Sequence, residues 1–187
     1  MSLNPLSGLF QASICSLFIL ASMHTSNVNA QLDLPEKWPQ RQGFSPLTSP
    51  APQGTKQAHR QISQNKDNAY LQQVIAEVRS WDHVFIQQSL VSVAGAVGFF
   101  IDQKHSSIEP GHFMRATEFA HIHPVDDGSF HLIVPEKVRS GLIKAGWAEP
   151  HPRKNHIIML YAPRDKAELG VVMNVLSISY QFSLKKT

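Results

Sequence analysis

E-F-A-H-I-H-P-V-D-D-G-S-F-H-L, from Glu118 to Leu132, is the stretch around which the other expected elements are arranged. His121 and His123 are two residues apart, so in a strand both imidazoles point to the same face of the sheet. The sequence Asp126-Asp127-Gly128 is typical of a tight turn, and the residues that follow have the composition of a returning strand. The stretch therefore predicts a β-hairpin that carries histidines on one face.

The position of His131 depends on the length of the turn. A two-residue turn places His123 opposite Leu132 and sends the His131 ring to the other face. A three-residue loop, with Gly128 in the left-handed position, pairs His123 with His131 and places three imidazoles on one surface. We expect the second register, because it also gathers apolar side chains on the opposite, core-facing side. These side chains are Ala120, Ile122, Phe130 and Leu132.

The beginning of the chain has the features of a targeting segment. The apolar run from Ile14 to Met23 is shorter than the ~20 residues that a membrane-spanning helix needs. Val28-Asn29-Ala30 supplies the small residues of a cleavage site. We therefore expect residues 1–30 to be a signal peptide and the mature protein to be secreted or periplasmic, with membrane contact only through this segment. An uncleaved membrane anchor is the alternative.

Composition restricts the chemistry available to the rest of the chain. Cys15 is the only cysteine and lies in the expected signal peptide, so neither a disulfide nor a thiolate metal site is expected. The net charge of +3 is too small and too scattered to indicate nucleic acid as a partner. The sequence contains no P-loop, G-x-S-x-G or C-x-x-C motif. Histidine, carboxylate, tyrosine, arginine and backbone groups are left to carry any chemistry.

Two further parts follow the signal peptide. Residues 31–64 are rich in proline, glutamine and serine and predict a flexible or surface-bound arm, docked through Trp38 or Phe44. Residues 65–187 suit a single domain of ordinary size.

Hydrophobic periodicity gives the element order of this domain. Helices are expected over residues 65–81, 136–145 and 165–180, and strands over 84–89, 97–102, the two arms of the hairpin, and 155–161. The order is helix, four strands, helix, strand, helix. We expect an α+β fold with a mainly antiparallel sheet of about five strands and the helices on one face. The histidines on the other face would line a groove closed by the loops at 103–117 and 147–154.

Five motifs in this order resemble the luciferase-like domain family, whose named member is the luciferase of bioluminescent fungi. The motifs are E-F-A-H-I-H-P, F-H-L, A-G-W-A-E-P-H-P, L-Y-A-P-R-D and E-L-G-V-V. The resemblance covers Phe113 to Phe182 and, more loosely, the segment from His59 to Gln64.

The resemblance implies an oxygenase-type enzyme with no certain cofactor. The fungal member oxidises a hydroxylated styryl-pyrone with molecular oxygen, which requires a base to ionise an enol and donors to hold the anion. The ligand is therefore expected to be a small aromatic or enolic molecule. By matching position, the resemblance implies catalytic roles and one substrate-binding role. The catalytic set is Glu118, His121, His123, His131, His151, Tyr161 and Arg164, and the substrate-binding residue is Trp147.

Two other functions remain open. His121, His123 and His131 could hold Zn or Fe, because imidazole nitrogens are common ligands of both metals. Alternatively, the domain could be a non-catalytic binding module of the cell envelope, in which the histidines only hydrogen-bond a ligand.

Two of the implied residues also have structural interpretations. Strict alternation places Glu118 on the face opposite His121, so an ion pair with Arg115 or Arg164 is expected unless a bulge rotates it. Trp147, directly after a helix-ending glycine, is typical of core packing.

Overall fold

The computed structural model describes residues 34–49, 58–64, 68–124 and 126–186. The expected signal peptide at residues 1–30 lies outside the described residues. In chain order, the elements are β1 (Thr48–Ser49), β2 (Arg60–Gln61), α1 (Asn68–Arg79), β3 (Val84–Gln88), β4 (Val97–Ile101), β5 (Glu118–Ile122), β6 (Phe130–Ile133), α2 (Glu136–Lys144), β7 (Ala148–Pro150), β8 (Ile157–Leu160) and α3 (Lys166–Ser183).

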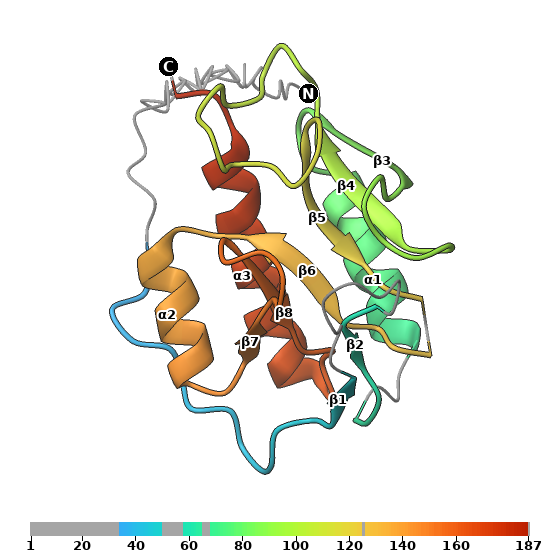
Figure 1. Ribbon diagram of the computed structural model, residues 1–187, viewed down its shortest axis with the longest axis vertical. Helices are drawn as coiled ribbons and strands as arrows, with labels where there is room; N and C mark the ends of the chain where they lie inside the picture. The colour runs from blue at the N-terminus through green and yellow to red at the C-terminus, as the bar shows by residue number, and fades with distance from the viewer. Residues whose placement is uncertain (1–33, 50–57, 65–67, 125, 187) are drawn as a thin grey trace, which may run out of the picture.

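The main sheet is antiparallel and has the strand order β3-β4-β5-β6-β8-β7 (Figure 1). The fold is α+β as expected, but this sheet has six strands rather than about five. The added strand is β7, which lies in residues expected to form a loop. It is three residues long and ends in Pro150, which suits an edge strand because proline has no N–H to donate to a ladder. So short a strand leaves no alternating pattern in the sequence.

The helices begin and end close to the expected positions, and the reasons are visible at their ends. The Asp165 side chain accepts a hydrogen bond of 2.9 Å from the Glu168 N–H and so caps α3. Gly146 follows α2 with φ of +77°, the left-handed conformation that glycine adopts without strain.

One core joins the sheet to the helices. In the view of Figure 1, α1 and α3 lie behind the sheet, and α2 lies at the β7 end. The core-facing residues of the hairpin are all buried, as expected. They pack with Val138 and Leu142 of α2 and with Val172 and Leu176 of α3. The opposite sheet face therefore remains for the histidines.

The hairpin register differs from the expected one. His121, rather than His123, lies opposite His131, and the His123 N–H bonds the Ser129 carbonyl at 2.9 Å. The loop is therefore two residues longer than the predicted turn, although Gly128 does adopt a left-handed φ of +69°. Because the shift is an even number of residues, all three imidazoles still share one face.

A bulge at the start of β5 changes the direction of Glu118. In the β4–β5 ladder Phe99 pairs with Ala120, but Phe100 pairs with Glu118, so Phe119 is an extra residue. Phe119 points into the core and packs against Phe99. Glu118 is thereby rotated to the histidine face. Its carboxylate pairs with His121, and the expected ion pair with Arg115 or Arg164 is not formed.

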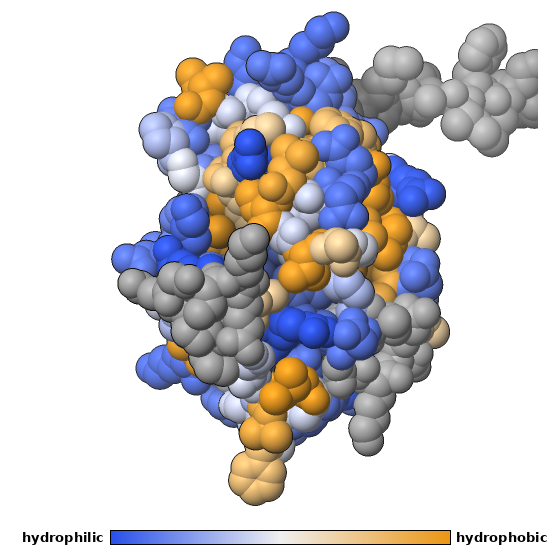
Figure 2. Space-filling view, turned by 45° about the vertical axis from the view of Figure 1, so that its right-hand side comes forward, coloured by the Kyte–Doolittle hydropathy of each residue, from blue (hydrophilic) through white to orange (hydrophobic). Residues whose placement is uncertain are grey.

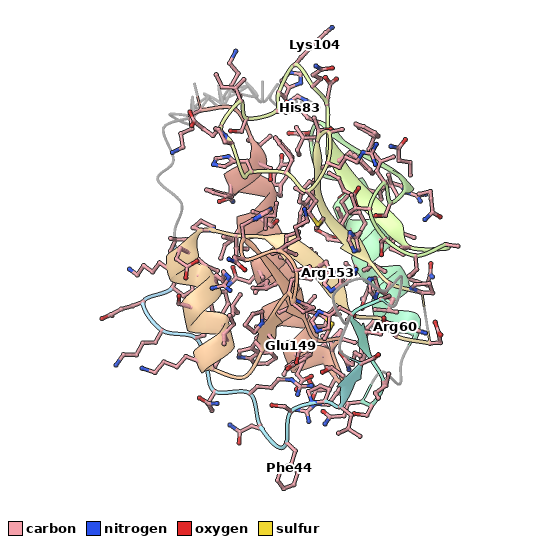
Figure 3. The ribbon with its side chains drawn as sticks, viewed as in Figure 1. Phe44, Arg60, His83, Lys104, Glu149 and Arg153 are labelled. Carbon is pink, nitrogen blue, oxygen red and sulfur yellow. The ribbon has the colours of Figure 1, made fainter. Side chains whose placement is uncertain are left out.

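The described part of the arm is docked on the domain. Trp38 packs on α2 at Gly141, where a Cβ atom would lie 2.8 Å from the indole ring. The Arg41 N–H bonds the Ala145 carbonyl at 2.9 Å. Phe44, by contrast, is 91% exposed and projects from the lower end of the molecule (Figure 3). Docking therefore uses Trp38 and not Phe44.

The outer surface mixes apolar and polar patches on the face drawn in Figure 2. Within the described residues, none of the helices combines the length and the apolar composition needed to span a membrane.

Candidate functional site

A cavity of about 530 Å³ opens on the histidine face of the sheet. Its floor consists of His121 and His131 from the central strands, together with His123 just after β5. Its walls come from the two loops expected to close the groove, from the β3–β4 loop, from the arm and from the first residue of β8. The residues that line these walls are Ala58, His59, Val91, Ser92, Val93, Met114, His151, Arg153, Lys154 and Ile157.

His121 is held by a fully buried carboxylate. Its Nδ1 lies 2.9 Å from Glu118 Oε1, and Glu118 has an exposed fraction of 0%. The same carboxylate accepts hydrogen bonds from the Ser89 hydroxyl at 2.6 Å and from the Leu90 N–H at 2.9 Å. A carboxylate only accepts hydrogen bonds, so the proton of the neutral ring is on Nδ1 and Nε2 carries a lone pair. Burial, followed by the nearby His123, lowers the pKa of His121.

His123 has a carboxylate partner of its own. Its Nδ1 bonds Asp127 Oδ2 across the hairpin loop. Asp127 Oδ1 accepts from the Ser129 hydroxyl at 2.6 Å and from the Gln61 N–H at 3.0 Å. Burial alone would raise the pKa of Asp127, but the hydrogen bonds from these neighbours lower it. Asp127 is a site residue that sequence reasoning missed, because it was assigned only to the turn.

His131 lies at the centre of the cluster. Its Nδ1 is 3.2 Å from His121 Nε2, and its buried Nε2 has no hydrogen-bond partner among the described residues. Burial, together with His121 and His123, holds the pKa of His131 well below its ordinary value. The ring is therefore neutral and presents a lone pair.

The arm contributes a further histidine that was not among the expected site residues. His59 is 4% exposed and stacks on His131 with ring centroids 5.5 Å apart. Its Nε2 bonds Glu149 Oε1. Glu149 also accepts a 3.0 Å hydrogen bond from the Tyr161 hydroxyl. The only sequence signal for His59 was the loose likeness of residues 59–64 to the family, and Glu149 lies inside the quoted A-E-P-H-P motif.

His151 lies at the wall of the cavity, 5.0 Å from His131 between ring centroids. Its Nδ1 accepts the Arg153 N–H at 3.1 Å. Burial, followed by the charges of His59 and Arg153, lowers the pKa of His151 to about 4.

The remaining predicted residues do not line the cavity. Tyr161 is connected to it through Glu149. Arg164 forms an ion pair with Glu168 and donates to the Gln42 carbonyl at 2.7 Å, so it holds the arm. Trp147 is 5% exposed, packs in the core, and donates to the Pro39 carbonyl at 2.6 Å.

Among the described residues, two overlapping groups of imidazoles could hold a metal ion. One is His121, His123 and His131, and the other is His59, His131 and His151. In each group the ligand atoms lie within 4.8 Å of one another. Two nitrogens bound to one ion at ~2.1 Å lie at most ~4.2 Å apart, so small side-chain movements would complete either group.

A known family matches the part of the chain that carries most of these histidines. Residues 116–179 match the family model described as Luciferase domain. This region is a luciferase-like domain. The luciferase-like domain begins just before β5 and extends into α3, so it contains His121, His123, His131 and His151 but not His59. No curated protein and no solved structure matches the chain.

Proposed function

We propose that this protein is an oxygenase-type enzyme that oxidises a small enolic or aromatic molecule with molecular oxygen at a metal ion held by His121, His123 and His131. The observation that carries the proposal is the pairing of two of these imidazoles with buried carboxylates beside a cavity of ligand size. The luciferase-like domain supports oxygenase chemistry, because its named member uses molecular oxygen.

The donor set supports a metal ion. Metal-bound histidines commonly donate their other ring N–H to a carboxylate, which fixes the tautomer and increases the basicity of the ligand nitrogen. Glu118 and Asp127 stand in this relation to His121 and His123. Three neutral imidazoles leave coordination positions open, as in catalytic rather than structural sites. Imidazole suits Zn and Fe alike, and for oxygen chemistry we favour iron.

The cavity walls support a particular kind of ligand. Val91, Val93, Met114 and Ile157 provide apolar surface for a ring system. Arg153 and Lys154 supply positive charge at the wall, which favours an anionic oxygen on the ligand. A bound metal would act as a Lewis acid toward that oxygen. Glu118 and Asp127 lie behind the histidines, and the two positive charges of a bound Zn or Fe(II) ion would balance their negative charges.

The cofactor-free alternative uses the same residues differently. In it, His123, oriented by Asp127, removes the enol proton directly. Both versions require the histidine cluster, so only the dependence on metal separates them.

The test is oxygen uptake with a panel of hydroxylated pyrones and other enolic aromatic compounds. The full chain is freed of metal with a chelator and then reloaded with Fe(II) or Zn(II). We expect uptake in the iron-loaded protein, its loss in His131→Ala, and its retention in the exposed control His156→Ala. Equal uptake by the metal-free protein would support the cofactor-free version, and metal binding without turnover of any panel member would contradict the proposed activity.

We also propose that the enzyme is secreted or periplasmic, on the basis of the expected signal peptide. Determining the N-terminal residue of the mature protein tests this, because cleavage after Ala30 would leave Gln31 first.

A further inference from the structure

We infer that His59, His131 and His151 form a subsite for a hydroxyl group of the ligand, in addition to its anionic oxygen. The inference deepens the proposed function and rests on the proposed metal ion, which fixes the proton of His131. It extends the site beyond residues 116–179 to a segment far away in the sequence. The ligand class is then a ring compound that carries a neutral hydroxyl group as well as an anionic oxygen.

Strand β2 fixes His59 at the cavity. Gln61, two residues later, is fully buried, and its N–H bonds Asp127 Oδ1 at 3.0 Å. The Gln61 side-chain oxygen accepts the Ala162 N–H at 2.9 Å. The buried His59 ring stacks on His131 with an angle of 18° between the two planes. The arm therefore places an imidazole directly beside a proposed metal ligand without adding to the ligands themselves.

A carboxylate orients the His59 ring. Nε2 bonds Glu149 Oε1, so the ring proton is on Nε2, and in the neutral ring Nδ1 carries the lone pair. Glu149 is held in place because it also accepts hydrogen bonds from the Tyr161 hydroxyl at 3.0 Å and from Thr48 at 3.3 Å. His59 Nδ1 is buried and has no partner among the described residues. It is therefore an acceptor that a ligand can use.

His151 presents a donor to the same space. Its Nδ1 accepts the Arg153 N–H at 3.1 Å, so the ring proton is on Nε2. Both rings are thus fixed by hydrogen bonds at their outer nitrogens. Glu149 and Arg153, which make these bonds, lie in the same region of the molecule in Figure 3.

His131 adds a second donor when the metal ion is bound. Its Nδ1 faces His121 Nε2 at 3.2 Å, which makes Nδ1 the nitrogen of the metal centre. A neutral imidazole that binds a metal through Nδ1 carries its proton on Nε2. His131 Nε2 is buried and has no partner among the described residues, so this proton is available to a ligand.

The three nitrogens together match a hydroxyl group. One ring nitrogen from each of the three histidines lies within 4.8 Å of the other two. An oxygen about 2.8 Å from two nitrogens can separate them by up to about 5.6 Å, so it fits without movement of the rings. A hydroxyl group has one hydrogen to donate and two lone pairs that accept. The subsite offers one acceptor and two donors, so every hydrogen bond of the group is satisfied.

A second metal ion is the competing occupant of this group of histidines. To bind it, His151 would have to break its hydrogen bond with the Arg153 N–H in order to free a lone pair. His131, with a metal on each nitrogen, would have to lose its remaining proton as well. A hydroxyl group requires neither change.

The test compares 3-hydroxybenzoate with 3-methoxybenzoate, which lacks the hydroxyl hydrogen, by calorimetric titration of the Zn(II)-loaded full chain. We expect the wild type to bind the hydroxy compound about 10-fold more tightly. His59→Leu should abolish this preference, and His59→Asn, whose side-chain oxygen can replace Nδ1 as acceptor, should keep most of it. His151→Ala should weaken both compounds alike, because both oxygens accept from its N–H. The exposed control His156→Ala should bind as the wild type does.

The possible failures are distinguishable when the zinc content and circular dichroism of each sample are also measured. A zinc-loaded wild type that binds both compounds equally, or neither, would overturn the subsite and leave the metal centre standing. The full preference in a folded His59→Leu would also overturn it. Two zinc ions per chain would favour the second metal ion instead. A wild type that takes up no zinc would overturn the metal centre and this inference with it.

Discussion

Asp127 connects the hairpin loop to the site. The sequence predicted a turn at this position, and Gly128 does adopt the left-handed conformation expected there. The role of the Asp127 side chain could not be predicted, because it depends on a longer loop that folds the carboxylate back onto His123. In the same way, the shared face of His121 and His123 followed from alternation and the face of His131 from the apolar pattern of the hairpin, whereas the pairing of His121 with His131 depended on the loop length.

Asp127→Asn should weaken metal binding by ~10–100-fold. The new amide can keep accepting from Ser129, but its NH₂ group would donate to His123 Nδ1 and so move the ring proton to Nε2, where it blocks the ligand lone pair. Asp126→Asn is the matched control, because Asp126 is exposed and pairs with Arg60. Chelator competition on both variants measures the effect, and equal affinities would contradict the orienting role of Asp127.

At the scale of elements, the strongly periodic segments were predicted and the irregular ones were not. The three helices and the strands β3 to β6 follow from apolar spacing. The bulge at Phe119 rotates Glu118 to the histidine face. Side-chain alternation in the sequence could not show whether such a bulge was present. The three-residue strand β7 carries Glu149, but it is too short to show a period. The parts of the site built on these irregularities were therefore the ones that could not be derived.

Gly98→Ala should lower the free energy of unfolding by about 1–3 kcal/mol through overpacking. A Cβ on Gly98 would lie 2.6 Å from the Phe100 ring and 3.0 Å from the Ser89 Cα, so the backbone that holds Glu118 has to move. Gly170→Ala in α3 is the control. That Cβ would have no neighbour within 4 Å, and the substitution should stabilise the helix by about 0.5–1 kcal/mol. Urea unfolding measures both, and a stable Gly98→Ala protein would contradict the close approach of β4 to Ser89.

At the scale of the whole molecule, the arm is bound to the surface of the domain, which is one of the two expected states. Proline-rich, weakly apolar sequence predicted a flexible or surface-bound segment, and Trp38 was one of the two expected docking points. Besides Trp38, the described part is joined to the domain through buried polar contacts, including Arg41 with Glu168, and these contacts were not expected. Polar contacts between distant segments leave no periodic signal in the sequence, which is why His59 was missed.

Gln61→Ala should loosen the arm and lower the free energy of unfolding by about 1–3 kcal/mol, because it leaves the buried Ala162 N–H unpaired. The neighbouring Ile62 is 57% exposed, so Ile62→Ala should change stability by less than about 0.5 kcal/mol. Hydrogen exchange of residues 58–64 and urea unfolding follow the two variants. Equal exchange rates would mean that Gln61 does not anchor the arm.

The most direct test of the central claim is the metal content of the purified full chain, measured by elemental analysis beside His123→Ala. We expect close to one transition-metal ion per chain in the wild type, and its loss in the variant, because one of three neutral nitrogen ligands is removed. A wild-type protein that holds no metal, and takes up none when Fe(II), Zn(II) or Co(II) is supplied, would contradict the claim.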